Sequence, residues 1–176
     1  MTRLAILILA AISLGAPALA QSQPSPLKVA VFRFEYIDRS GADSATAEVE
    51  GRRLDLVTDY VRRKFEESDR YELVDVAAVG ELDDKRLADP AIEGYLSECE
   101  GCEAEIAAAL GAELSLFGVV TRVTGLVLTV NVLVHDAKTG QLTAVHGVNI
   151  RGNSDTSWMR GISWLVRNRL FKETGG

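Results

Sequence analysis

Hydrophobic residues recur along the chain with more than one period, and each period predicts a type of element. From Leu54 to Phe65 they return every three or four positions, which predicts a helix over about 47–67 with one packed face. Around Val130 they alternate with polar residues, as in half-buried strands. The first residues of the chain are apolar almost throughout. The pattern therefore indicates mixed helices and strands behind an apolar N-terminal segment.

The N-terminal segment predicts export. Arg3 precedes the apolar run LAILILAAISLG, and the small residues Ala18 and Ala20 favour cleavage before Gln21. The run is shorter than the roughly 20 apolar residues that a membrane span needs. We therefore expect a signal peptide over residues 1–20, cleaved after Ala20, and a periplasmic protein with no stable membrane span after processing. Residues 21–26, QSQPSP, predict a flexible leader.

Residues 27–172 predict a single α/β domain that opens with a strand–helix–strand unit. The run VAVFRF indicates a largely buried strand, and a second strand is expected from Tyr71 to Val76, after the helix. The crossover between the two would be right-handed if they are parallel. Residues 103–110 then predict a short helix, with Gly111 at its C-terminal end.

The second half of this domain predicts a meander and a closing helix. Three strands are expected over 114–123, 126–136 and 142–150, because Gly125 and the turn DAKTG separate them. Ser154 or Asp155 is expected to cap the last helix. The fold class is therefore α/β (α+β): a mixed sheet of about five strands, with an antiparallel three-strand meander and helices packed on the sheet.

The closing helix and the turn before it carry candidate contact residues. Trp158 shares an apolar face with Ile162 and Leu165, whereas Trp164 projects roughly opposite. Because aromatic and arginine side chains are enriched at interface hot spots, this region predicts partner binding. The predicted residues are Arg151, Asn153, Asp155, Trp158, Arg160 and Trp164. Two alternatives stay open: Trp164 covers a loop of the same chain, and the 151–155 junction is simply a capped turn.

The charge balance argues against nucleic-acid partners. The chain has 19 basic and 25 acidic residues and a net charge of −6, and its arginines are mixed with acids along the first helix. No nucleophile–base motif, zinc-protease motif or phosphate-binding loop is present. The acids around Asp83 and Asp89 lack the spacing of an EF-hand. We therefore predict no catalytic residues, no metal and no cofactor.

Cys99 and Cys102 are the only cysteines, in the stretch SECEGCEAEI. In an oxidising compartment two neighbouring cysteines usually pair, which favours a structural disulfide. Redox exchange would need a low thiol pKa, and the surrounding glutamates disfavour a thiolate. Zinc would need two further ligands, for which only His135 and His146 exist. The structural, redox and metal interpretations all stay open at this stage.

The segment 77–102 has no sustained period and contains Pro90 and Gly94. Long excursions from a compact domain are often functional, so one hypothesis makes the region from Glu81 to Cys102 a lid over a small ligand. Disorder is the competing interpretation.

The stretch EIAAALGAELSLFGVVTRV, followed by LVLTVNVLVHDAKTG, resembles the N-terminal domain of TolB. Similar proteins include CsgG-type secretion proteins and LpoB-type activators of peptidoglycan synthases. The cysteine pair and IRGNSDTSW are similar to an uncharacterised family of exported proteobacterial proteins, filed as a domain of unknown function. The resemblance implies envelope-protein binding without catalysis, and a link to a quinoprotein dehydrogenase system.

The sequence thus favours a non-catalytic periplasmic protein that binds or assists another envelope or periplasmic protein. One alternative is a thiol-redox or metal-accessory protein that uses the Cys99–Cys102 pair. The other is a small-ligand-binding protein. Neither a partner identity nor an oligomeric state follows from the residues.

Overall fold

The computed structural model describes residues 25–41, 47–82, 89, 95–99 and 101–172. A six-stranded sheet runs through its middle in the order β3-β1-β4-β5-β6, and β2 also pairs with β4. The strands are β1 (Leu27–Val31), β2 (Glu35–Asp38), β3 (Tyr71–Leu73), β4 (Leu114–Thr124), β5 (Val127–Asp136) and β6 (Leu142–Arg151). The helices are α1 (Ala47–Glu66), η1 (Val76–Glu81), η2 (Leu96–Glu98), α3 (Cys102–Ala109), α4 (Asp155–Leu165) and η3 (Val166–Leu170). The mixed α/β class and the closing helix are confirmed.

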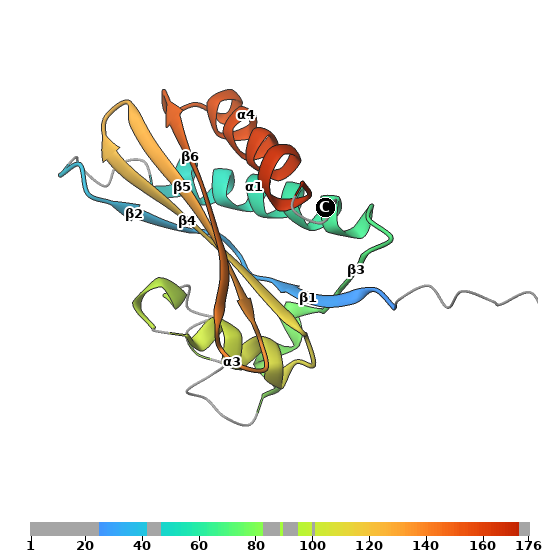
Figure 1. Ribbon diagram of the computed structural model, residues 1–176. Helices are drawn as coiled ribbons and strands as arrows, with labels where there is room; N and C mark the ends of the chain where they lie inside the picture. The colour runs from blue at the N-terminus through green and yellow to red at the C-terminus, as the bar shows by residue number, and fades with distance from the viewer. Residues whose placement is uncertain (1–24, 42–46, 83–88, 90–94, 100, 173–176) are drawn as a thin grey trace, which may run out of the picture.

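The sheet is parallel in its first half and antiparallel in its second. β1 pairs in parallel with β3 and with β4, so β1, α1 and β3 form the predicted strand–helix–strand unit. β4, β5 and β6 form the predicted antiparallel meander. Figure 1 shows the long hairpin strands crossing the molecule, with α1 and α4 on one side and α3 on the other. We call these two sides the helix face and the cleft face of the sheet.

The predicted opening strand is interrupted. Phe34 N–H donates to Thr58 Oγ1 of α1 at 3.0 Å instead of joining the ladder, so the chain leaves the sheet between β1 and β2. The Phe34 ring lies so close to Gly118 of β4 that a Cβ there would approach it to 2.3 Å. Both strands still pair with β4 in parallel. A tertiary contact with α1 therefore decides the break.

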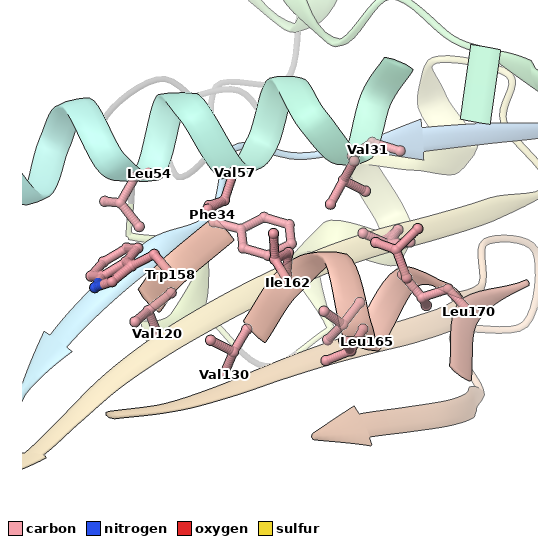
Figure 2. Close-up of a cluster of buried hydrophobic side chains, with 14 of the residues drawn as sticks. Val31, Phe34, Leu54, Val57, Val120, Val130, Trp158, Ile162, Leu165 and Leu170 are labelled. Carbon is pink, nitrogen blue, oxygen red and sulfur yellow. The ribbon is translucent and has the colours of Figure 1, made fainter. Parts of the chain in front are cut away.

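The main core lies between the helix face and the helices α1 and α4. α1 contributes Leu54, Val57, Val61 and Phe65, which are the residues whose spacing predicted its buried face. Figure 2 shows Trp158, Ile162 and Leu165 of α4 pointing toward Val120 and Val130 of the sheet. Burying each large apolar side chain contributes about 1.5–3 kcal/mol, so this cluster is the main source of stability.

The cleft face is only partly covered. α3, η1 and η2 pack a second core onto the part of the sheet near β1, where Ala30, Phe32 and Phe117 meet Leu96 and Ile106. In Figure 1 these segments lie on the side of the sheet opposite α1 and α4, and the part of this face that carries Asn131, Leu133 and Val145 opens to a cleft. The uncovered part forms the floor of the candidate site.

Several element boundaries differ from the prediction. β3 ends at Leu73 instead of Val76, because Asp75 caps η1 by accepting a hydrogen bond from Ala77 N–H at 2.9 Å. Ser154, one of the two predicted caps, is the N-cap of α4 and forms a capping box with Ser157. α4 then continues as a π-helical segment, η3, which the pattern did not indicate.

The N-terminal predictions lie largely outside the described residues. The signal peptide, its cleavage after Ala20 and the leader up to residue 24 all fall in residues 1–24. In the part of the chain that the structure does describe, no helix combines the length and apolar character that crossing a bilayer requires.

Candidate binding cleft

A cleft with a volume of about 580 Å³ opens on the cleft face of the sheet. Its floor mixes aliphatic and amide side chains from neighbouring strands: Val119 of β4, Asn131 and Leu133 of β5, and Val145 of β6. One wall is the segment around η2, including Leu96, Ser97 and Cys99. The cleft exists because α3 and η2 cover only part of this face.

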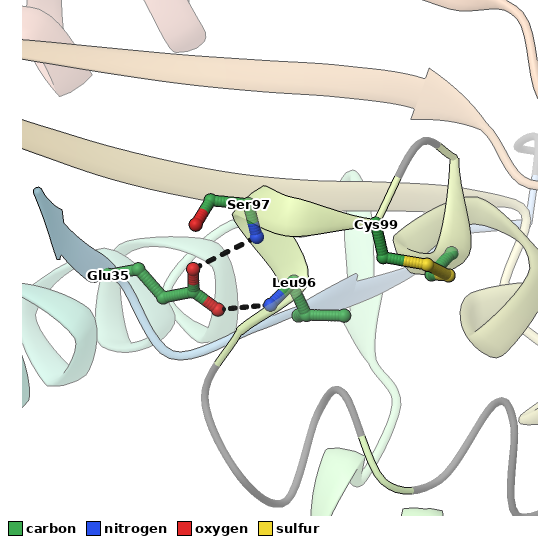
Figure 3. The surroundings of a disulfide bond; sticks show 5 residues. Glu35, Leu96, Ser97 and Cys99 are labelled. Atoms are coloured by element: carbon green, nitrogen blue, oxygen red, sulfur yellow. Dashed lines mark hydrogen bonds between the residues drawn. A yellow bond between two sulfur atoms is a disulfide. The ribbon is translucent and has the colours of Figure 1, made fainter.

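The wall is fixed by a buried carboxylate. Glu35 of β2 is 6% exposed and accepts hydrogen bonds from Leu96 N–H at 2.5 Å and Ser97 N–H at 2.9 Å. Figure 3 shows both bonds reaching the two oxygens of the same carboxylate. These are the N–H groups at the start of η2, which have no partner within that short helix. Leu96 itself is buried in the second core, so Glu35 and Leu96 together hold the wall against the sheet.

The predicted cysteine pair closes the other end of this wall. Cys99 and Cys102 lie within bonding distance, with Cα atoms 5.6 Å apart, and Figure 3 draws the disulfide. Gly101 between them has φ +80°, a left-handed conformation that glycine adopts without steric cost, and it precedes the first residue of α3. A disulfide here joins η2 directly to α3. A structural role for this bond stays a prediction, and redox exchange stays its alternative.

A serine lies beside a histidine and a glutamate that line the cleft. His135 Nδ1 lies 3.2 Å from Glu103 Oε1, and both side chains are at most a tenth exposed. Ser115 is the register partner of His135 across β4 and β5. However, Ser115 is 0% exposed, and its Oγ has no hydrogen-bond partner among the described residues. A nucleophile must reach substrate and be bonded to its base, so this geometry does not assemble a hydrolytic triad.

The two histidines do not meet. His135 lines the cleft, whereas His146 pairs with Val132 and therefore lies on the helix face. A zinc site built from both histidines and the cysteine pair is excluded by this placement. Among the described residues, no cluster of three or more cysteine, histidine or acidic side chains has metal-binding geometry.

The structure separates the six predicted partner-binding residues into two groups. Three of them form a network with Arg53 of α1, a residue that the sequence pattern did not single out, and in this network the Asp155 side chain is 71% exposed. Arg53 donates to Asp155 Oδ1 at 2.6 Å and to Asn153 Oδ1 at 2.9 Å. Asn153 Oδ1 also accepts from Trp158 Nε1 at 2.9 Å. Trp158 is 1% exposed, so its ring belongs to the core and is not accessible to a partner.

The other three predicted residues are exposed. Arg151 ends β6, Arg160 lies on the outer side of α4, and Trp164 is 42% exposed one turn after Arg160. The ring contact of Trp164 in the described part of the chain is with Arg169, whose guanidinium carbon lies 5.8 Å from the ring centre. Because Trp164 is on the helix side and the cleft is on the opposite face, the molecule has two distinct candidate surfaces.

A second polar network lies near the start of α1. Tyr36 Oη donates to Glu50 Oε1 at 2.9 Å, and Arg122 Nη1 lies 3.7 Å from the same oxygen. Burial, reinforced by Glu50, raises the pKa of Tyr36 to about 12. The bond to Tyr36 raises the pKa of Arg122, which keeps that guanidinium charged. This network joins β2, β4 and α1 and is structural in character.

These features define an α/β domain with an open cleft and without an assembled catalytic set among its described residues. The chain belongs to the family described as "Protein of unknown function (DUF2380)", whose model, DUF3280, matches residues 27–170. No curated protein matches the sequence significantly.

Solved structures share the fold at low sequence identity. The LpoB C-terminal domain from Salmonella enterica is 12% identical, with a TM-score of 0.50 over 75% of this chain and 87% of that chain. The lipoprotein GNA1162 from Neisseria meningitidis is 14% identical, with a TM-score of 0.47 over 84% of this chain and 98% of that chain. The similarity to the LpoB domain confirms the expected LpoB-like fold.

Proposed function

We propose that this chain is a non-catalytic binding protein of the periplasm that accepts an extended segment of a partner protein in the cleft. The observation that carries the proposal is the continuity of the cleft with an open sheet edge. β6 is ten residues long and pairs only with β5 among the described strands. Val145 lines the cleft from this edge strand and is 53% exposed.

The edge offers main-chain hydrogen bonds. Gly152 N–H donates to Leu126 O at 2.8 Å, so Gly152 faces β5. Because the backbone groups of an antiparallel strand alternate in direction, those of Val145, Gly147 and Asn149 point away from β5. β6 contains neither proline nor lysine, which often protect free edges. An added strand would pair with these groups and direct alternate side chains over the cleft.

The floor suits a neutral segment with small aliphatic side chains. Gly147 leaves space for the side-chain amide of Asn131, because a Cβ there would lie 2.9 Å from Asn131 Oδ1. Asn131 can therefore present its amide beside Leu133 and Val145, and amides bind peptide groups without a charge requirement. That the partner belongs to a quinoprotein dehydrogenase system stays a prediction.

Site-specific photocrosslinking tests the proposal. A photoreactive side chain at Val145 should give a discrete adduct in the producing cell, whereas one at Leu56, 41% exposed on α1, should not. Val145→Arg should abolish co-purification of the partner, and Leu56→Arg should leave it unchanged. Equal adducts at both positions, or turnover of a substrate that depends on cleft residues, would contradict a non-catalytic cleft.

A small ligand is the second candidate occupant, since the volume of about 580 Å³ lies within the usual range of ligand pockets. A ligand that binds only the folded state raises the unfolding temperature by mass action. A thermal-shift screen with the wild type and Val145→Arg therefore distinguishes this candidate from a polypeptide partner. Residues 81–102, which would act as the lid, lie mostly outside the described residues.

A further inference from the structure

The outer face of α4 and η3 concentrates positive charge in an acidic protein. The basic residues of this region are Arg151, Arg160, Arg167, Arg169 and Lys172, whereas the whole chain has a net charge of −6. Asp155 is the only acid between residues 151 and 172, and Arg53 already pairs with it at 2.6 Å. The exposed side of this helix is therefore cationic.

Several arginines elsewhere in the fold already have acidic partners. Arg33 pairs with Asp55 at 2.6 Å, Arg52 with Glu48 at 3.1 Å and Arg122 with Asp38 at 3.4 Å. Arg160 and Arg167 are exposed, and no ion pair joins either of them to another described residue. Their guanidinium groups are available for carboxylates from outside the chain.

An exposed tryptophan lies among these charges. Trp164 is 42% exposed, and the guanidinium carbon of Arg169 lies 5.8 Å from its ring centre, within cation–π range. Asn168 Nδ2 donates to the carbonyl oxygen of Trp164 at 2.7 Å, at the start of the π-helical turn. π-Helical turns are frequent at functional sites. The ring is thus held on a fixed backbone, as a rigid interface anchor requires.

We propose that the outer face of α4 and η3, centred on Arg160, Trp164 and Arg167, docks an acidic segment of a partner protein. Arginine binds carboxylates through two parallel N–H donors, and tryptophan and arginine dominate interface hot spots. An amphipathic helix that enters a bilayer does so with its apolar face. The apolar face of α4 is occupied by Trp158, Ile162 and Leu165 in the core, which favours a protein over a lipid surface.

This surface is separate from the cleft, so its test does not depend on the cleft proposal. The probe is a fluorescein-labelled synthetic peptide rich in glutamate and leucine, and its glutamine-substituted version is the uncharged control. Binding is measured by fluorescence anisotropy with the full chain at two salt concentrations. We expect the acidic peptide to bind in a salt-sensitive manner and the glutamine peptide to bind much more weakly.

Variants locate the binding site. Arg160→Glu with Arg167→Glu, and separately Trp164→Ala, should each weaken binding of the acidic peptide by at least about tenfold, as expected for hot-spot residues. Arg52→Glu with Arg63→Glu makes the same charge change on exposed positions of α1 and should have little effect. Equal weakening by both charge pairs would indicate a net-charge effect and overturn the proposal.

Two further outcomes would also overturn it. Binding to vesicles that contain phosphatidylglycerol, without binding to the acidic peptide, would assign the surface to a membrane. Sedimentation that shows a dimer dissociated by Arg160→Glu with Arg167→Glu would assign it to a second copy of this chain. Circular dichroism of each variant establishes that the fold is retained.

Discussion

Glu35 allows a sharp test of how the cleft wall is held. The substitution Glu35→Gln keeps the size of the side chain but replaces one oxygen by an N–H₂ donor. Both groups that face the carboxylate, Leu96 N–H and Ser97 N–H, are donors themselves. One hydrogen bond is therefore lost, and two donors are placed against each other in a site that is 6% exposed.

The magnitude follows from the number of bonds. A hydrogen bond to a charged group contributes about 1.5–3 kcal/mol, and so Glu35→Gln should lower the free energy of unfolding by about 2 kcal/mol. Glu35→Ala removes both bonds and should cost about 3–4 kcal/mol, because Ser97 lies near the cleft and water can satisfy part of the loss. If the wall detaches locally, the loss is limited to the energy of burying Leu96, about 1.5–3 kcal/mol.

Two measurements separate these cases. Urea denaturation gives the global free energy of unfolding, and hydrogen exchange at the Leu96 and Ser97 amides gives the local opening energy. Glu98→Gln is the matched control, since it makes the same chemical change at an exposed position of η2, and it should stay within about 0.5 kcal/mol of wild type. Unchanged amide exchange in Glu35→Gln would refute the reasoning.

Four further predictions concern the core, the α1–α4 network, a tyrosine and the disulfide. Gly118→Ala should lower the free energy of unfolding by about 1–3 kcal/mol, because its Cβ would lie 2.3 Å from the Phe34 ring; Gly125→Ala, with no neighbour within 4 Å, is the denaturation control. Arg53→Ala should cost about 2 kcal/mol in the same assay, whereas Arg52→Ala, from an exposed pair, should cost about 0.5 kcal/mol or less. Tyr36 should ionise near pH 12 in an ultraviolet titration that uses Tyr36→Phe as the reference. Because its pKa is raised in the folded state, the stability that Tyr36 contributes is complete below pH 10.0 and is lost as the pH rises toward 12. Glu50→Gln should lower this pKa. Mass analysis of periplasmic protein with and without reductant should show the Cys99–Cys102 bond, and a reduction potential below about −300 mV would establish a structural disulfide, while a value near −120 to −200 mV would favour the redox alternative.

The sequence by itself determined the elements whose signals are local. The spacing of Leu54, Val57, Val61 and Phe65 predicted both the helix α1 and its buried face. Gly111 adopts φ +81° after α3, as its position after the short helix indicated. Turn residues separated the meander strands within a residue or two of their observed ends. These features depend on helix period, strand alternation and turn conformation, which neighbouring residues specify.

Only the tertiary structure decided which polar residues meet. Arg53 and Asn153 are a hundred positions apart in the chain, and their contact ties Asn153 to the buried Trp158, while Asp155 stays exposed and pairs with the same arginine. The wall at Leu96 depends on Glu35, 61 positions earlier. The cleft exists because α3 and η2 cover part of one sheet face, and no local period encodes how far a covering segment extends. Sequence periodicity specifies which side of an element is buried, whereas the packing of distant elements decides what it is buried against.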